Sequence, residues 1–147
     1  MDAVEDSVMI ALLPTTTDWC KQDLPHMTLV FCGKVADLRP SDFNEMAKDA
    51  CSIAQLSAPV ETTVLGIEVF GDDEPVNVLK LSATPELLSM RNFVDHWNAS
   101  TFPFSPHATI GPEGTFPDRI PRYLTFDRIV VAWGDEQLTF WLKKGYL

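Results

Sequence analysis

The sequence predicts an α+β fold: two pseudo-symmetric lobes of antiparallel β-sheet, flanked by helices, with a central cleft between them. Three observations predict it. Short apolar runs typical of strands occur near both ends of the chain, a β-hairpin pattern lies in the middle, and one helical pattern stands on each side of that hairpin. A length of 147 residues suits a single domain that spans residues 1–147.

The first half of the chain contains two strand patterns and a helix pattern. Residues 8–13 predict a strand that Pro14 ends, and a polar loop follows over residues 15–25. Residues 26–31 predict a second strand, ended by Gly33. Apolar residues at helical spacing predict a helix that begins at residues 40 and 41, with Ser41 as its cap, and runs to about Leu56.

The second half begins with the hairpin, which has arms at residues 60–70 and 76–83 around a turn at residues 71–75. Thr84 is the expected cap of a second helix, which has proline at its first position and runs to about Trp97. Another strand follows at residues 107–110. Residues 124–133 and 137–144 then predict a final strand pair, turned at residues 134–136. This order of elements predicts the internal two-lobe symmetry.

Two of these strands begin with the same short motif. One reads His26-Met27-Thr28 and the other His107-Ala108-Thr109. Side chains alternate between the two faces of a strand, so the histidine and threonine of each motif project the same way, about 7 Å apart. Two such strands placed side by side would direct two imidazoles and two hydroxyls into one cleft.

That set of side chains suits the cleavage of a phosphodiester without a metal. Histidine titrates near neutral pH and serves as either acid or base, and neutral hydroxyl donors stabilise phosphate oxygens. Each histidine taken alone is more often an ordinary strand residue, and threonine is common in strands anyway. The repeated setting favours a functional pair. His96, at the end of the second helix pattern, lacks the motif and is excluded.

The charge of the chain limits its partners. The net charge is −10, from 11 basic and 21 acidic residues, and no basic stripe is visible. A protein that grips long nucleic acid needs such a stripe, so we expect a small phosphate substrate and no long nucleic acid. No apolar stretch is long enough to cross a bilayer, and the acidic N-terminus lacks the basic region of a signal peptide. We therefore expect no membrane partner and a cytoplasmic location.

The three cysteines, Cys20, Cys32 and Cys51, form no pair typical of zinc binding. Their odd number, without a secretion signal, indicates reduced thiols. A nucleophilic Cys32 paired with a histidine is the less favoured alternative, because buried structural cysteines are commoner than nucleophiles. The two motif histidines are far apart in the sequence and no spacing pattern supplies a third metal ligand. We therefore expect no metal and no cofactor.

The two motifs also resemble a known family. His26-Met27-Thr28-Leu29-Val30-Phe31-Cys32-Gly33 resembles the first signature of the two-histidine (2H) phosphoesterases, and Phe104-Ser105-Pro106-His107-Ala108-Thr109-Ile110-Gly111 resembles the second. This superfamily includes the LigT-like 2′,5′ RNA ligases and cyclic phosphodiesterases. The resemblance implies a LigT-like fold and His/His general acid–base catalysis, with Thr28 and Thr109 as donors to the phosphate. It covers nearly the whole chain.

The chain departs from the family after the second motif. Several members carry a basic residue there, whereas Gly111 is followed by Pro112 and Glu113. Arg119 is the substitute that we expect to bind phosphate. A nucleobase would stack on aromatic side chains, of which Trp19, Phe116 and Trp141 are the candidates. Packing in the core is the alternative for all three.

The resemblance leaves several functions open. The first is hydrolysis of a cyclic dinucleotide or oligonucleotide signal, as in phage anti-CBASS members that destroy messengers of bacterial immunity in the host cytoplasm. The second is processing of 2′,3′-cyclic or 2′,5′-linked RNA ends. The third is a module that binds a nucleotide without turnover, and the last is a structural or partner-binding protein with a vestigial cleft. The acidic charge and the missing basic residue favour a small soluble substrate.

Overall fold

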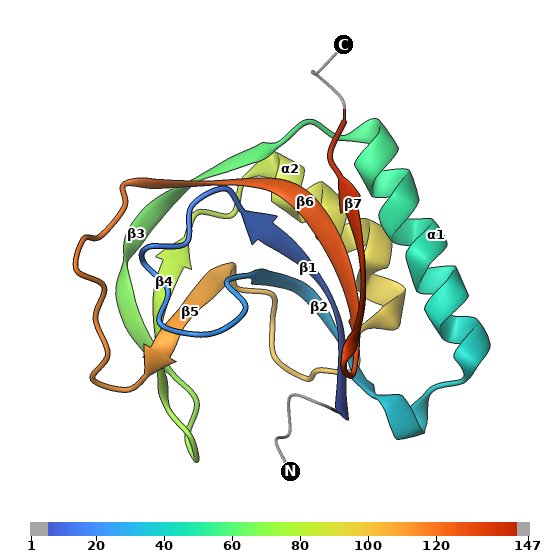
Figure 1. The fold of residues 1–147 in the computed structure, drawn as a ribbon, viewed down its shortest axis with the longest axis horizontal. Helices are drawn as coiled ribbons and strands as arrows, with labels where there is room; N and C mark the ends of the chain where they lie inside the picture. The colour runs from blue at the N-terminus through green and yellow to red at the C-terminus, as the bar shows by residue number, and fades with distance from the viewer. Residues whose placement is uncertain (1–5, 144–147) are drawn as a thin grey trace.

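The computed structural model describes residues 6–143 and shows one antiparallel sheet with both α-helices on the same side (Figure 1). The helices are α1 (Pro40–Leu56) and α2 (Pro85–Val94), with short 3-10 turns η2 (Val35–Asp37) and η3 (Asp95–Trp97). The strands are β1 (Ser7–Pro14), β2 (Met27–Lys34), β3 (Val60–Phe70), β4 (Val76–Leu81), β5 (His107–Pro112), β6 (Tyr123–Trp133) and β7 (Glu136–Trp141).

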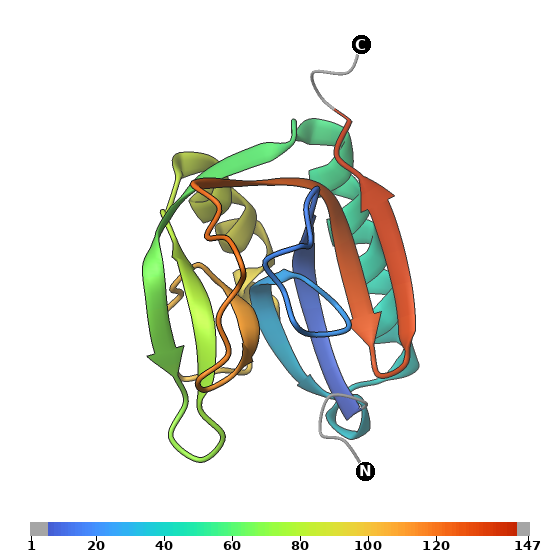
Figure 2. The same ribbon diagram turned by 60° about the vertical axis from the view of Figure 1, so that its left-hand side comes forward.

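The strand order is β1-β2-β5-β4-β3-β6-β7, and β6 also pairs with β1, so the sheet closes on itself. Residues 123–126 of β6 pair with β3, whereas residues 128–133 lie between β1 and β7. The strands therefore fall into two groups, β7-β6-β1-β2 and β5-β4-β3, which Figure 2 shows side by side. The strands β2 and β5 join the groups through a single residue pair, Met27 with Ala108.

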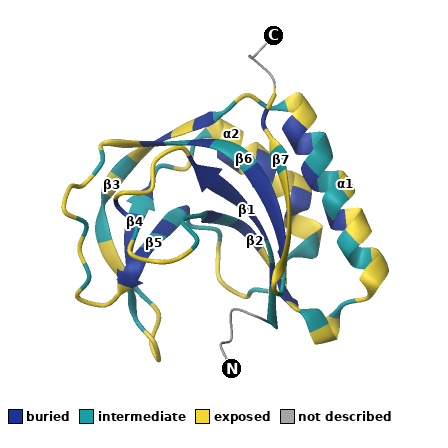
Figure 3. Ribbon diagram, viewed as in Figure 1, coloured by how far each residue is buried: buried dark blue, intermediate teal, exposed yellow. Residues whose placement is uncertain are grey.

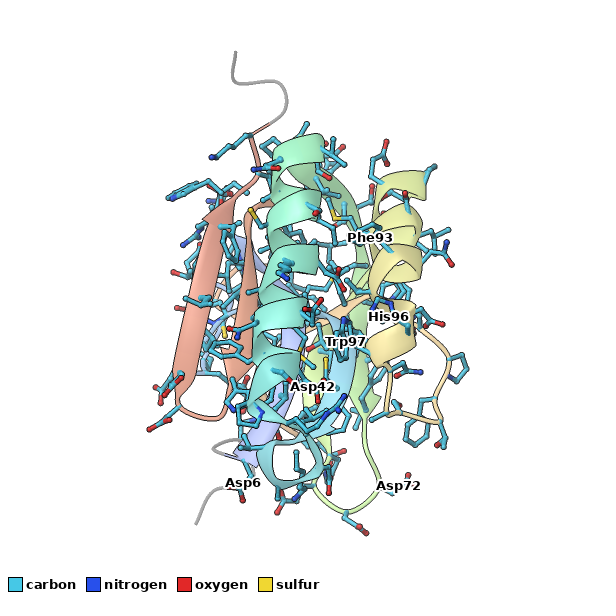
Figure 4. All side chains as sticks on the ribbon, turned by 90° about the vertical axis from the view of Figure 1, so that its right-hand side faces the viewer. Asp6, Asp42, Asp72, Phe93, His96 and Trp97 are labelled. Atoms are coloured by element: carbon cyan, nitrogen blue, oxygen red, sulfur yellow. The ribbon has the colours of Figure 1, made fainter. Side chains whose placement is uncertain are left out.

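The core lies between the sheet and the helices. Met27 and Ala108, from the two motif strands, are completely buried in it, together with Met46 of α1 and Leu87 of α2. Figure 3 shows this burial concentrated in β1 and β6, with exposed residues along the outer faces of the helices. In Figure 4, α1 and α2 lie side by side over the core, and Trp97 and His96 are on this helix side. Within residues 6–143, the other face of the sheet thus carries no helix.

The predicted α+β class and order of elements are confirmed, with differences at the ends of elements. Thr84 caps α2 as expected, because its Oγ1 accepts a hydrogen bond from the Leu87 backbone N–H at 3.2 Å. The expectation that Ser41 caps α1 is wrong. Proline is the first helical residue there, so the cap is Arg39, whose backbone N–H donates to Asp42 Oδ2 at 2.8 Å.

Most strands differ from their predicted bounds by one or two residues, and β2 and β7 differ by three at their C-terminal ends. Gly33 does not end β2, because its positive φ of 104° accommodates an irregularity in the pairing with β1 and the strand continues to Lys34. The strand β7 ends at Trp141, and Lys144, which we expected in it, lies outside the described residues. Between residues 6 and 143, no helix has the length and apolar character needed to span a membrane.

Candidate active site

The two histidine motifs meet where β2 and β5 pair. Met27 and Ala108 are direct partners and point into the core. The residues on either side of each partner therefore point to the opposite, helix-free face of the sheet, which we call the histidine face. These residues are His26, which immediately precedes β2, and Thr28 in β2, together with His107 and Thr109 at the start of β5.

The antiparallel register arranges these four side chains as a square. Extending the Met27–Ala108 register by one residue in each direction sets His26 opposite Thr109 and Thr28 opposite His107. The two histidines then occupy one diagonal and the two threonines the other. Diagonal neighbours in an antiparallel pair are separated by about 7–8 Å. The imidazoles are close enough that the positive charge of His26 lowers the pKa of His107. A phosphate group placed over the square would lie within reach of all four residues.

Each imidazole is held by the same backbone contact. The Nδ1 atom of His26 lies 2.7 Å from the Leu24 carbonyl oxygen, and that of His107 lies 2.7 Å from the Ser105 carbonyl oxygen. A carbonyl only accepts hydrogen bonds, so Nδ1 carries the hydrogen in both rings. Nε2 is consequently the nitrogen of each ring that is left to exchange a proton with a substrate.

The chain favours this contact locally, because a proline stands between the acceptor and the histidine in both motifs. Pro25 and Pro106 fix φ near −65° and hold the preceding residue in an extended conformation. The carbonyl two residues before the histidine accepts its Nδ1–H in both places. The repeated X-Pro-His sequence is a signal from which this contact could have been predicted.

Both histidines favour the neutral state. Burial lowers the pKa of His26, and the Leu24 carbonyl only partly opposes this effect. Burial also lowers the pKa of His107, against the opposing Ser105 carbonyl, and the positive charges of Lys80 and His26 lower it further. His107 thus has an additional reason to remain unprotonated.

The two threonines have hydroxyl groups that are available for a ligand. Thr28 Oγ1 donates only to the thioether of Met9, at 3.5 Å, and a thioether is a weak acceptor. Thr28 and Thr109 are both partly buried. Exchanging the Met9 contact for a phosphate oxygen would be favourable, because hydrogen bonds to charged groups are the stronger ones.

Two residues beside His107 were missed in the sequence. Lys80 on β4 is the direct cross-strand partner of His107, and its Nζ donates to Ser105 Oγ. The ring of Phe70, at the end of β3, lies with its centroid 4.6 Å from that of His107. Neither residue belongs to a motif, and their positions follow only from the pairing of β3, β4 and β5.

The expectation that Trp19 stacks on a nucleobase is wrong. Its side chain is 0% exposed and belongs to the main core, and its indole N–H donates to the Thr16 carbonyl at 2.7 Å. Trp19 anchors the loop of residues 15–25 instead. The Lys21 backbone N–H, which donates to the Ile110 carbonyl at 2.8 Å, fastens the same loop to β5.

We expect Trp19→Ala to lower the free energy of unfolding by about 3–5 kcal/mol, the usual cost of deleting a buried aromatic side chain. Trp141→Ala is the matched control, because Trp141 is 58% exposed and should cost about 1 kcal/mol or less. Chemical denaturation of both variants measures the difference. Equal losses would contradict the anchoring role.

The other predicted binding residues lie on the surface. Phe116 is exposed on the loop between β5 and β6, and Arg119 is exposed on the same loop. Trp141 is on β7, where the guanidinium of Arg128 lies 5.3 Å from its ring centroid. Arg128 and Val130 project from β6 to the face away from the helices. Trp141 is the cross-strand partner of Arg128, so it also lies on the histidine face, three strands from His26. Their contact with a substrate stays a prediction.

The cysteine alternative is not supported. Cys32 is buried, and burial raises the pKa of its thiol to about 12, so the thiolate needed for attack is scarce. In the part of the chain that the structure describes, no three His, Cys, Asp or Glu side chains are grouped so as to hold a metal ion. The independence from metal remains a prediction.

The arrangement of strands and helices is that of the LigT-like fold, which the motif resemblance implied. TT0787 of Thermus thermophilus has this fold with a TM-score of 0.65 at 16% identity, over 95% of this chain and 99% of that one. Usb1 of Kluyveromyces marxianus has it with a TM-score of 0.67 at 13% identity, over 94% of this chain and 99% of that one. Escherichia coli LigT complexed with 3′-AMP has it with a TM-score of 0.56 at 18% identity, over 94% of this chain and 95% of that one. No protein-family model and no curated protein sequence matches the chain.

Proposed function

We propose that this chain is a phosphodiesterase that hydrolyses, without a metal, a cyclic or 2′/3′-linked phosphodiester in a small nucleotide. The observation that carries the proposal is the square of two histidines and two threonines on the helix-free face of the sheet. Both imidazoles are fixed through Nδ1 and have Nε2 left for chemistry. Solved structures of similar fold add support, because Escherichia coli LigT is found in complexes with 3′-AMP, ATP and NADP+.

The reaction requires one proton to be removed and another to be supplied. One Nε2 accepts a proton from the attacking water as its oxygen bonds to phosphorus, and the other Nε2 donates a proton to the ribose oxygen as the phosphorus–oxygen bond breaks. The threonine hydroxyls donate to the non-bridging oxygens, where negative charge accumulates. The products are a phosphate monoester and a free hydroxyl. The two histidines then exchange protons with solvent.

The charges near the two histidines differ, and this favours distinct roles. Lys80 is the direct partner of His107 and lowers its pKa, so His107 is better suited to begin as the neutral base. His26 has no such neighbour among the causes of its pKa shift and is better suited to carry the proton that the leaving oxygen receives. We therefore assign His107 as the base and His26 as the acid.

The substrate classes that fit this proposal are cyclic dinucleotide or oligonucleotide signals, 2′,3′-cyclic phosphates and 2′,5′-linked oligonucleotides. The test is an assay of the purified protein in EDTA against one member of each class, with products separated by chromatography. We expect at least one to be cleaved at a rate that the chelator does not change. Tight binding without cleavage would favour a nucleotide-binding module. If the protein neither bound nor cleaved any of these substrates, the proposal would be contradicted.

The pH dependence follows from the direction of the pKa shifts. The base must be neutral and the acid protonated, and both groups titrate below the ordinary histidine value near 6.5. We therefore expect kcat/KM to peak below about pH 6.5 and to fall already at neutral pH, as the acid loses its proton. A bound anionic substrate raises both pKa values, so the kcat profile should lie at higher pH. A kcat/KM optimum above neutral pH would contradict the shifts.

A further inference from the structure

The register between β4 and β5 places Lys80 beside the square. Lys80 and His107 are direct partners, and residues paired across strands project to the same face of a sheet. On its other side, Lys80 is paired with Gly66 of β3. A Cβ atom built on Gly66 would meet no atom within 4 Å. The space beside Lys80 toward β3 is therefore open.

Lys80 also differs from the other basic residues in its charge environment. Among the lysines and arginines between residues 6 and 143, three are partly buried, namely Lys80, Arg91 and Arg128. Two of these, Arg91 and Arg128, form ion pairs with Asp95 and Asp127. Lys80 has no carboxylate partner within the described residues. Partial removal of an ammonium from water without a counter-ion costs free energy, which a bound anion would recover.

The contacts of Lys80 place its ammonium on the Nδ1 side of the His107 ring. Ser105 accepts from both residues: its Oγ accepts from Lys80 Nζ, and its carbonyl oxygen accepts from His107 Nδ1. Phe70 lies against both, with its ring centroid 5.8 Å from Nζ and 4.6 Å from the centroid of the imidazole. The reacting phosphate must lie at Nε2, on the other side of the ring.

We propose that Lys80 binds a second, non-reacting phosphate of the substrate. This inference rests on the proposed function and narrows its substrate to dinucleotides and oligonucleotides, linear or cyclic, with at least two phosphates. An ammonium that donates one hydrogen to Ser105 retains two further donors for phosphate oxygens. A nucleoside 2′,3′-cyclic phosphate has one phosphate, which the square of catalytic residues would occupy, and it would leave Lys80 without an anion.

The test compares two substrates in the same variant. The probes are a cyclic dinucleotide, with two phosphates, and adenosine 2′,3′-cyclic phosphate, with one. Lys80→Met alters the surroundings of His107 equally for both substrates, so the ratio of their kcat/KM values isolates the second phosphate. We expect this ratio to fall by roughly 10-fold to 100-fold, the equivalent of one charge-assisted hydrogen bond. Lys80→Arg, which keeps the charge, should recover part of it.

Lys34→Met removes the same charge from an exposed position at the far end of β2 and should leave the ratio unchanged. An unchanged ratio in Lys80→Met, or a preference of the unaltered protein for the cyclic mononucleotide, would overturn the inference. If neither probe is cleaved, the proposed function fails for these substrates, and calorimetry then compares the probes as ligands of the full chain. The inference then requires that Lys80→Met weaken the binding of the cyclic dinucleotide and leave the binding of the cyclic mononucleotide unchanged. If neither probe binds, the inference is rejected as well.

Discussion

Replacing either histidine of the square by alanine is expected to lower kcat/KM by about 100-fold to 10,000-fold, the range typical of losing a general acid or base. Each imidazole is fixed by one backbone carbonyl. The third histidine of the chain, His96, is on the helix side of the sheet, so no other imidazole replaces the one that is lost. His96→Ala is the matched control, because His96 pairs with Asp49 on the helix side of the sheet. It should retain full activity.

Two further measurements make this prediction sharper. In the assigned roles, a nitrophenyl phosphodiester, whose leaving group departs without a proton, should restore much of the activity of His26→Ala and little of that of His107→Ala. The double variant should be scarcely slower than the worse single variant, because residues that act as one unit are not additive. Full activity in both single variants would reject the mechanism, and the opposite pattern of rescue would exchange the two roles.

The shared face within each motif was predictable because it depends only on alternation within strands. His26 and Thr28 share a face in any strand that contains both, and the same is true of His107 and Thr109. That the two strands pair at Met27 and Ala108 is a long-range fact that local patterns do not contain. The repeated motif predicted that the strands converge, whereas their register, and hence the diagonal placement of the histidines, required the structure.

The residues that the sequence misjudged depend on tertiary contacts. Trp19 stands in a polar loop, and such a context does not distinguish a tryptophan that stacks on a ligand from one that fastens the loop to the core. Lys80 lies within an ordinary strand pattern and gains significance only from its pairing with His107. Ser41 has a cap-forming side chain, but the proline before it already occupies the first helical position.

The two halves of the site are similar in backbone and different in charge. Both histidines follow a proline, and both donate through Nδ1 to the carbonyl two residues earlier. Lys80 and Phe70, however, adjoin only His107 within the described contacts. A symmetric pair of imidazoles has no preferred direction of proton transfer. Residues from β3 and β4 thus supply an asymmetry that the repeated motif lacks.

The threonine pair provides the second large effect. Thr28→Val and Thr109→Val replace a hydroxyl by a methyl group of similar size and keep the strand preference of the residue. Each is expected to lower kcat by about 100-fold to 1,000-fold, the cost of removing one preorganised donor from a transition state, and the double variant should lose more than either. KM should change less, because the charge on the non-bridging oxygens increases mainly in the transition state.

Thr139→Val is the matched control for this pair. Thr139 on β7 lies in the same cross-strand row as Thr28, through Ala11 and Val130, and therefore projects from the same face of the sheet. Three strand spacings separate the two, roughly 14 Å. Substrates with sulfur in place of one non-bridging oxygen then show which oxygen each threonine contacts. A variant that lacks the threonine hydroxyl for a given oxygen should cleave the substrate with sulfur at that position as fast as it cleaves the normal substrate. A double variant within tenfold of the unaltered protein would mean that the hydroxyls do not contact the phosphate, and the square would reduce to its two histidines.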